Sequence, residues 1–298
     1  MNSKVQSLKD FLRQPGRVAL VEVAATKGST PREAGAFMLV SASETLGTIG
    51  GGQLEYMAID KARQMLGGRA ASRAAASEAR IDVEEVCATL DVPLGPEIGQ
   101  CCGGRVEVLI RLVDAALAAE LIGKAEAEEA HLPHVYVFGG GHVGQALAAS
   151  LALLPIHAVV VETRAEALEG MPKTVESRLM PMPEAAVREA PAGSAFAILT
   201  HDHALDFLIV AEALKRNDTA YVGMIGSKTK KATFKNWFLK SAEGSEAEFN
   251  RLVSPIGGNA VKDKRPPVIA ALAVAEIMKA LVSHAARASA APEKAMAG

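Results

Sequence analysis

Two spacings of hydrophobic residues organise the first part of the chain. Residues 3–14 carry apolar side chains at helical intervals, whereas residues 17–26 and 36–42 are short apolar runs typical of buried strands. Residues 45–66 pass from a glycine turn into an amphipathic helix, and residues 105–113 alternate apolar and polar positions as a strand does. This mixture predicts an N-terminal mixed α/β domain.

The second part of the chain alternates short apolar runs with helical segments. Such alternation indicates a parallel sheet covered by helices on both faces, and therefore a C-terminal Rossmann-like domain. We place the domains at residues 1–130 and 131–284, and we expect residues 285–298 to form a disordered tail because they are small and low in information. The apolar runs are "HVYVFG", "IHAVVVET", "AFAILTHD" and "AYVGMIGS".

Composition excludes several classes of protein. The chain has 298 residues, of which 49% are hydrophobic, enough for two buried cores. A net charge of −2 with dispersed basic residues argues against nucleic acid as a partner. No signal peptide or membrane span is evident, and three cysteines cannot make a disulfide framework. We therefore expect a cytoplasmic protein with reduced thiols and no membrane association.

The segment "VYVFGGGHVGQAL" places Gly139, Gly141 and Gly144 in a G-x-G-x-x-G spacing. The glycines follow a predicted strand and open a predicted helix, which is the context that binds a phosphate. Glu162 ends the next strand, where an acidic residue would bind a ribose hydroxyl of NAD. A glycine loop with only a structural role is the alternative, and the phosphate-bearing ligand need not be NAD.

A second set of candidate anion-binding residues lies in the N-terminal domain. Gly50, Gly51 and Gly52 lead directly into a helix, and the loop "KGSTPRE" supplies Lys27 and Arg32. Cations near a glycine turn form a plausible anion clamp. A flexible connection and a solvated turn are equally consistent with these residues.

Cys101 and Cys102 are adjacent in the glycine-rich segment "GQCCGG". Neighbouring cysteines seldom bridge each other, and zinc would need more ligands at other spacings. A soft thiolate suits contact with molybdenum or with an incoming sulfur atom, so we assign both residues to ligand or metal contact. Cys87, in an apolar run, better fits the role of a small buried hydrophobe.

Polar residues also follow two later strands. "THDHALD" places His201 beyond a strand, the address of ligand sites in open parallel sheets, while Asp202 is a candidate helix cap. We expect these residues to line a pocket rather than hold a metal. "MIGSKTKK" places Ser227 and several lysines at a helix start, which suits a second phosphate; a solvated lysine face is the alternative.

Together these segments resemble the xanthine dehydrogenase accessory protein family, XdhC/CoxI. The matching segments occur in family order from about residue 20 to about residue 230 and span both domains. They are "VEVAATKGSTPREAGAFMLV", "GTIGGGQLE", "GQCCGGRVEVLIR", "VFGGGHVGQAL", "THDHALD" and "YVGMIGSK". Near the C-terminus, "PIGGNAVKDKRPPVIAALAVAEI" lacks the acidic helix start that is usual in the family.

The resemblance implies a cofactor-insertion chaperone rather than a turnover enzyme. Such a protein binds the molybdenum cofactor, protects it, assists its sulfuration and inserts it into the molybdenum-binding subunit of xanthine dehydrogenase. The resemblance also implies a cysteine desulfurase as a partner and a homodimer. An NAD(P)-dependent oxidoreductase is the main alternative, although it leaves the cysteine pair unexplained. A Rossmann-like scaffold that only docks proteins is a third.

Overall fold

The computed structural model describes residues 4–67, 87–94 and 103–295, the side chains of residues 289–295 excepted. The chain divides into two compact units, one of residues 3–127 and one of residues 128–298. The border falls at the end of helix α3 (Ala115–Ala130), and the domain limits named above stay predictions. Cys101 and Cys102 lie outside the described residues.

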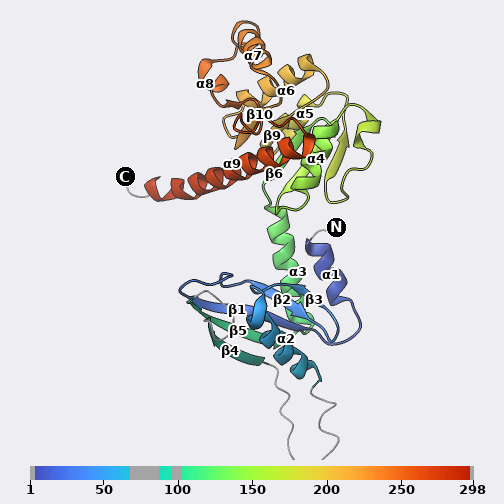
Figure 1. Ribbon diagram of the computed structural model, residues 1–298, viewed down its shortest axis with the longest axis vertical. Helices are drawn as coiled ribbons and strands as arrows, with labels where there is room; N and C mark the ends of the chain where they lie inside the picture. The colour runs from blue at the N-terminus through green and yellow to red at the C-terminus, as the bar shows by residue number, and fades with distance from the viewer. Residues whose placement is uncertain (1–3, 68–86, 95–102, 296–298) are drawn as a thin grey trace, which may run out of the picture. The chain divides into compact units, whose positions relative to one another are not determined.

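The N-terminal unit contains a five-stranded sheet in which the described neighbours are all antiparallel (Figure 1). In register, Val21 of the central strand lies opposite Met38 on one side and Ile110 on the other. In spatial order the strands are β3 (Thr45–Gly47), β2 (Phe37–Val40), β1 (Ala19–Lys27), β5 (Arg105–Leu112) and β4 (Cys87–Pro93).

Alternation along these strands builds a core on each face of the sheet. Val21 and Val108 pack in a cluster with Leu54 and Ala58 of helix α2 (Gly52–Gly67). Leu20, one position away, points to the opposite face and joins a cluster with residues of α1 (Lys4–Leu12) and α3. Because side chains alternate across a strand, one sheet can be covered by helices on both faces.

The C-terminal unit contains a six-stranded sheet in which every described pair is parallel, in the order β11-β10-β9-β6-β7-β8. The chain adds β7 and β8 on one side of β6 and then β9, β10 and β11 on the other side. This is the strand order of a Rossmann fold. The strands are β6 (His134–Phe138), β7 (His157–Glu162), β8 (Glu176–Leu179), β9 (Ala195–Ile198), β10 (Tyr221–Met224) and β11 (Leu252–Val253).

Helices cover both faces of this sheet (Figure 1). Helices α4 (His142–Leu151) and α9 (Pro266–Ala295) pack with the strand residues of one face. Helices α5 (Glu184–Glu189), α6 (His203–Lys215), α7 (Lys228–Lys240) and α8 (Glu246–Phe249) pack on the other, and a short 3-10 helix, η3 (Ala165–Leu168), follows β7. The fold class predicted from the sequence is therefore confirmed.

Two expectations about individual segments are wrong. Cys87 is exposed rather than buried, because the alternation of edge strand β4 turns Ala88 and Val92 inward. Helix α9 runs on to Ala295, through most of the stretch expected to be a disordered tail. Alanine has the highest helix propensity, so an alanine-rich sequence can extend a helix that is already anchored.

Helix α9 is also long and apolar enough, over Pro266–Ala288, to cross a membrane by length and composition alone. Its buried residues Ala270, Ala273 and Ile277 belong to the core cluster that contains β6 and α4. A core helix passes the same test of length and composition, so this property is weak support for a span.

Candidate functional site

The chain that follows the cysteine pair lies against the loop after β1. A Cβ atom added to Gly104 would stand 2.2 Å from the carbonyl oxygen of Ser29 and 2.8 Å from that of Lys27. A side chain there would therefore collide with backbone, which only glycine avoids. The Gly104 carbonyl also accepts a hydrogen bond of 2.8 Å from the Leu94 amide, which fixes this approach.

The glycine turn before α2 lies against the same loop from another direction. A Cβ on Gly50 would stand 2.6 Å from Cγ of Pro31, and the Gly50 φ of +128° is in the region that favours glycine. The Gly50 amide donates a 3.1 Å hydrogen bond to Oγ1 of Thr48. Residues 27–32, 50–52 and 103–104 thus form one N-terminal loop cluster.

Two cations belong to this N-terminal loop cluster. Lys27 and Arg32 are exposed, and within the described residues neither side chain has an ion-pair partner. Glu55, in the first turn of α2, accepts a hydrogen bond of 3.3 Å from the Thr48 hydroxyl and already places a negative charge near the glycine turn. The positive charge available to an anion therefore comes from Lys27 and Arg32 more than from the helix start.

The second glycine loop lies where the strand order of the C-terminal sheet reverses, between β6 and β9. A Cβ on Gly139 would stand 2.4 Å from the carbonyl oxygen of Leu199, and one on Gly144 would stand 1.9 Å from that of Gly139. Nothing lies within 4 Å of a Cβ on Gly141, so the loop is open there. These contacts match the tight turn, close packing and backbone access of a phosphate-binding loop.

A cavity of about 280 Å³ lies at this glycine loop. Ligands of open parallel sheets bind at such a reversal point, outside the carboxyl ends of the strands. His201 lines this cavity together with Gly139, Gly141 and Gly144. The binding roles of these residues stay predictions. The lining of the cavity includes Gly139, Gly141, His142, Gly144, Glu162, Arg164, Thr200 and His201.

Glu162 is buried at 4% exposure, and its carboxylate is already occupied. One oxygen accepts hydrogen bonds from the Gly140 amide at 2.9 Å and from the Arg164 guanidinium at 3.3 Å; the other accepts from the Thr163 amide at 2.8 Å. Burial by itself would raise the pKa of this carboxyl, but the hydrogen bonds from Gly140 and Arg164 lower it to about 2. A ribose hydroxyl would have to displace one of these partners.

The acidic residues of "THDHALD" have structural roles. Asp202 caps α6, accepting a 2.8 Å hydrogen bond from the Ala204 amide. Asp206 is fully buried; it accepts from the Thr200 amide at 2.9 Å and pairs with Lys230 of α7. No group of three or more His, Cys, Asp or Glu side chains suited to a metal occurs among residues 4–67, 87–94 and 103–295.

The lysines after β10 divide between two roles. Ser227 caps α7 by accepting a 3.2 Å hydrogen bond from the Lys230 amide. The Lys230 side chain turns inward to Asp206, and Lys231 reaches the Leu252 carbonyl at 3.4 Å. Of the lysines expected to attract a phosphate, Lys228 lines a cavity beside Ser227.

Comparison with known proteins identifies the family. A model described as the XdhC Rossmann domain matches residues 135–277, and one described as the XdhC and CoxI family matches residues 11–74. The two matched segments cover more than half of the chain. The chain belongs to the XdhC family.

One sequence relative and one solved structure are similar to this XdhC family chain over most of its length. It is 25% identical over 270 residues to the uncharacterized protein YqeB of Escherichia coli K12; the match covers 88% of this chain but 43% of YqeB, less than half of that relative. It also resembles a crystal structure of a xanthine dehydrogenase from Bacillus halodurans, with a TM-score of 0.74 and 17% identity over 95% of this chain and 96% of that one. At this identity the likeness shows the fold alone.

Sequence reasoning missed one residue and one ion pair of the XdhC family chain that line or support these sites. Arg164 stands two positions after Glu162, at the end of a strand beside the reversal point, which was an available signal. The Asp206–Lys230 pair had no signal, because its members lie on different helices and only their packing brings them together.

Proposed function

We propose that this XdhC family chain binds the molybdenum cofactor as cargo, shields it, assists its sulfuration and delivers it to xanthine dehydrogenase. The observation that supports this most directly is the contact of Gly104 with the backbone of Lys27 and Ser29. It places Gly104, two positions after the cysteine pair, against the loop that also carries the exposed cations Lys27 and Arg32. A soft sulfur donor and cations that attract an anion are what a metal-dithiolene carrying a phosphate requires.

In this proposal, Cys101 and Cys102 contact molybdenum or the sulfur that enters it. Lys27 and Arg32 attract the anionic cargo toward the cysteine pair, and Gly50–Gly52 let it approach the backbone. A cysteine desulfurase supplies sulfur, and the molybdenum-binding subunit of xanthine dehydrogenase receives the cargo. Assembly as a homodimer and residence in the cytoplasm belong to the same proposal.

The occupied carboxylate of Glu162 weighs against the NAD-dependent form of the alternative, an oxidoreductase. In an NAD-dependent enzyme of this fold the acidic residue after the second strand accepts the ribose hydroxyls. Here its oxygens already accept from Gly140, Thr163 and Arg164. The glycine loop at Gly139, Gly141 and Gly144 remains open to a phosphate, so anion binding there does not depend on a dinucleotide.

The test is to purify the chain from cells that make the molybdenum cofactor and from cells that do not. We expect bound pterin only in the first preparation, and little of it in the double variant Cys101→Ser/Cys102→Ser. Cys87→Ser is the matched control, since Cys87 is exposed in β4 and distant in sequence from the pair.

Delivery is then measured as activation of apo-xanthine dehydrogenase, with bound NAD(P) assayed in parallel. A double variant that activates the apoenzyme as well as the wild type does would refute the proposal. Stoichiometric NAD(P) with hydride transfer would establish the oxidoreductase instead.

A further inference from the structure

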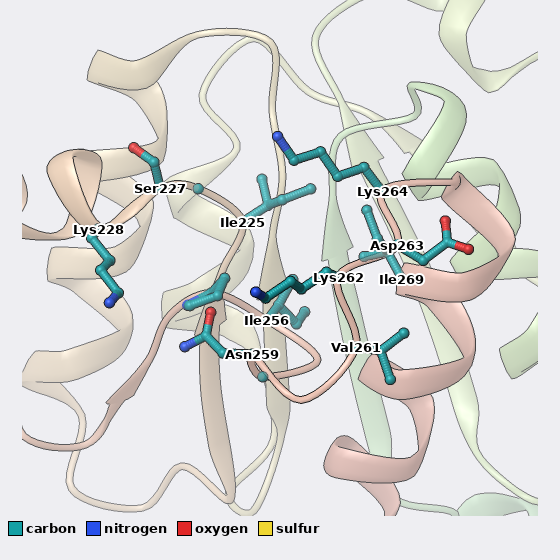
Figure 2. A pocket seen from close by; sticks show the side chains of 13 residues that line it. Ile225, Ser227, Lys228, Ile256, Asn259, Val261, Lys262, Asp263, Lys264 and Ile269 are labelled. Carbon is teal, nitrogen blue, oxygen red and sulfur yellow. The ribbon is translucent and has the colours of Figure 1, made fainter.

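A second and larger cavity, of about 760 Å³, opens beyond the carboxyl end of β10 (Figure 2). Its walls are the start of α7, the loop of residues 255–264 and the first turn of α9. Ile225 lines both this cavity and the smaller one at the glycine loop, so the two are neighbours on the same edge of the sheet. The volume is in the range of small-molecule sites.

Three ammonium groups line this cavity from two sides. Lys228 comes from α7, whereas Lys262 and Lys264 come from the loop and extend toward the α7 side (Figure 2). Within the part of the chain that the structure describes, none of the three has a hydrogen-bond or ion-pair partner. Asp263 is a lining carboxylate, but Arg265 holds it with hydrogen bonds of 2.5 and 2.9 Å. The cavity is therefore left with unneutralised positive charge.

The start of α7 adds uncharged donors to the same side. Ser227 uses its oxygen to accept from the Lys230 amide, which leaves the hydroxyl proton free to donate. The first amides of a helix have no partner within the helix and favour an anion. The positive end of the dipole of α7, a helix of 13 residues, lies at this N-terminus and adds to the lysine charges.

The remaining wall is apolar and firmly held. Ile225, Ile256 and Ile269 form it, with Ile256 buried at 4% exposure. Behind this loop, the Glu276 carboxylate of α9 accepts hydrogen bonds from the Gly257 amide at 2.9 Å and the Tyr221 hydroxyl at 2.8 Å. An apolar wall and a positively charged wall in one cavity suit a ligand with an apolar ring at one end and an anion at the other.

We propose that this cavity binds the phosphate ester of a planar heterocycle, with the phosphate on Lys228, Lys262, Lys264 and Ser227 and the ring on the isoleucines. This rests on the proposed function in one respect: the cargo proposed above carries a pterin and a phosphate. A purine nucleotide shares the same chemistry, so the test separates the two sources.

The probes are 6-hydroxymethylpterin phosphate, the same pterin without phosphate, AMP and inorganic phosphate, each titrated into the full chain and followed by calorimetry. Wild type should bind the pterin phosphate more tightly than either of its halves. Lys262→Glu/Lys264→Glu should weaken that binding about tenfold or more, since two attractions become repulsions. Lys240→Glu/Lys279→Glu is the matched control: it changes the charge equally at exposed positions of α7 and α9 outside the cavity lining, and it should retain wild-type affinity.

Equal binding by the cavity variant and the wild type overturns the proposal, as does an equal loss in the control. Tighter binding of AMP than of the pterin phosphate would leave the cavity as a nucleotide site and reject the pterin as its occupant. Cys101→Ser/Cys102→Ser should bind the pterin phosphate normally. If that variant also delivers cofactor normally, the proposed function fails while the cavity assignment stands.

Discussion

The two units hold their candidate sites together by different means. In the N-terminal loop cluster, Gly104 lets two stretches of backbone come into contact, and Gly50 lets the backbone contact a proline ring. The cations Lys27 and Arg32 are exposed and have no ion-pair partner in the described part of the chain. The carboxyl edge of the parallel sheet contains close-packed glycines and, in addition, buried charges. Asp206 pairs with Lys230, and Glu162 accepts a hydrogen bond from the Gly140 amide of the glycine loop. Both sites should thus be sensitive to added volume, and the second should also be sensitive to lost charge and to pH.

The largest effect is expected from Asp206→Ala. It leaves the Lys230 ammonium buried without its partner, and breaking a buried pair in this way costs about 3–5 kcal/mol of unfolding free energy. Urea denaturation measures the loss. The exposed Lys9–Glu126 pair of the N-terminal unit is the control, because Glu126→Ala should cost less than about 1 kcal/mol. Similar losses in both variants would contradict the distinction between the units.

The next effect is a dependence on pH at Glu162. Its pKa in the folded chain is about 2, below the ordinary 4.5, so the carboxylate stabilises the fold above about pH 4.5 and this contribution disappears as the pH falls toward 2. At neutral pH it amounts to about 3 kcal/mol. Denaturation of wild type and Glu162→Gln across this range should give curves that converge at low pH. A constant separation between them would show that the charge is not responsible.

Added volume should destabilise the N-terminal loop cluster, which has no buried ion pair among its described residues. Gly104→Ala forces a methyl group into the Ser29 carbonyl and should cost about 1–3 kcal/mol, with a matching loss of cofactor delivery. Gly103→Ala is an unusually close control, since nothing lies within 4 Å of a Cβ at that position. Thermal denaturation and apoenzyme activation should separate these neighbours, and equal behaviour would mean that the loops are not held by this contact.

The smallest effect is expected at Asp202. Asp202→Ala removes the cap of α6 and should cost about 1 kcal/mol, whereas Asp202→Asn should retain most of the stability. Neither change should alter ligand affinity, because the carboxylate acts as a cap. A fall in pterin phosphate affinity with unchanged melting temperature would instead assign Asp202 to a binding site.

Local patterns predicted much of the fold. The Gly139, Gly141 and Gly144 spacing, read together with the strand before it and the helix after it, correctly predicted a Rossmann-like unit. Strands β3 and β4 were not predicted. β3 has three residues, too few to display the alternation of a strand, and β4 begins at Cys87, which lies in a run that reads as buried.

The sequence by itself determined which segments form strands and helices and where glycine must stand, since these features depend on side chains a few positions apart. Only the tertiary structure decided that Gly104 meets Ser29, that Lys230 turns inward to Asp206, and that Lys262 and Lys264 face Ser227 across a cavity. These contacts join residues on different elements. Their distances follow from the order of strands in each sheet, which no local period encodes.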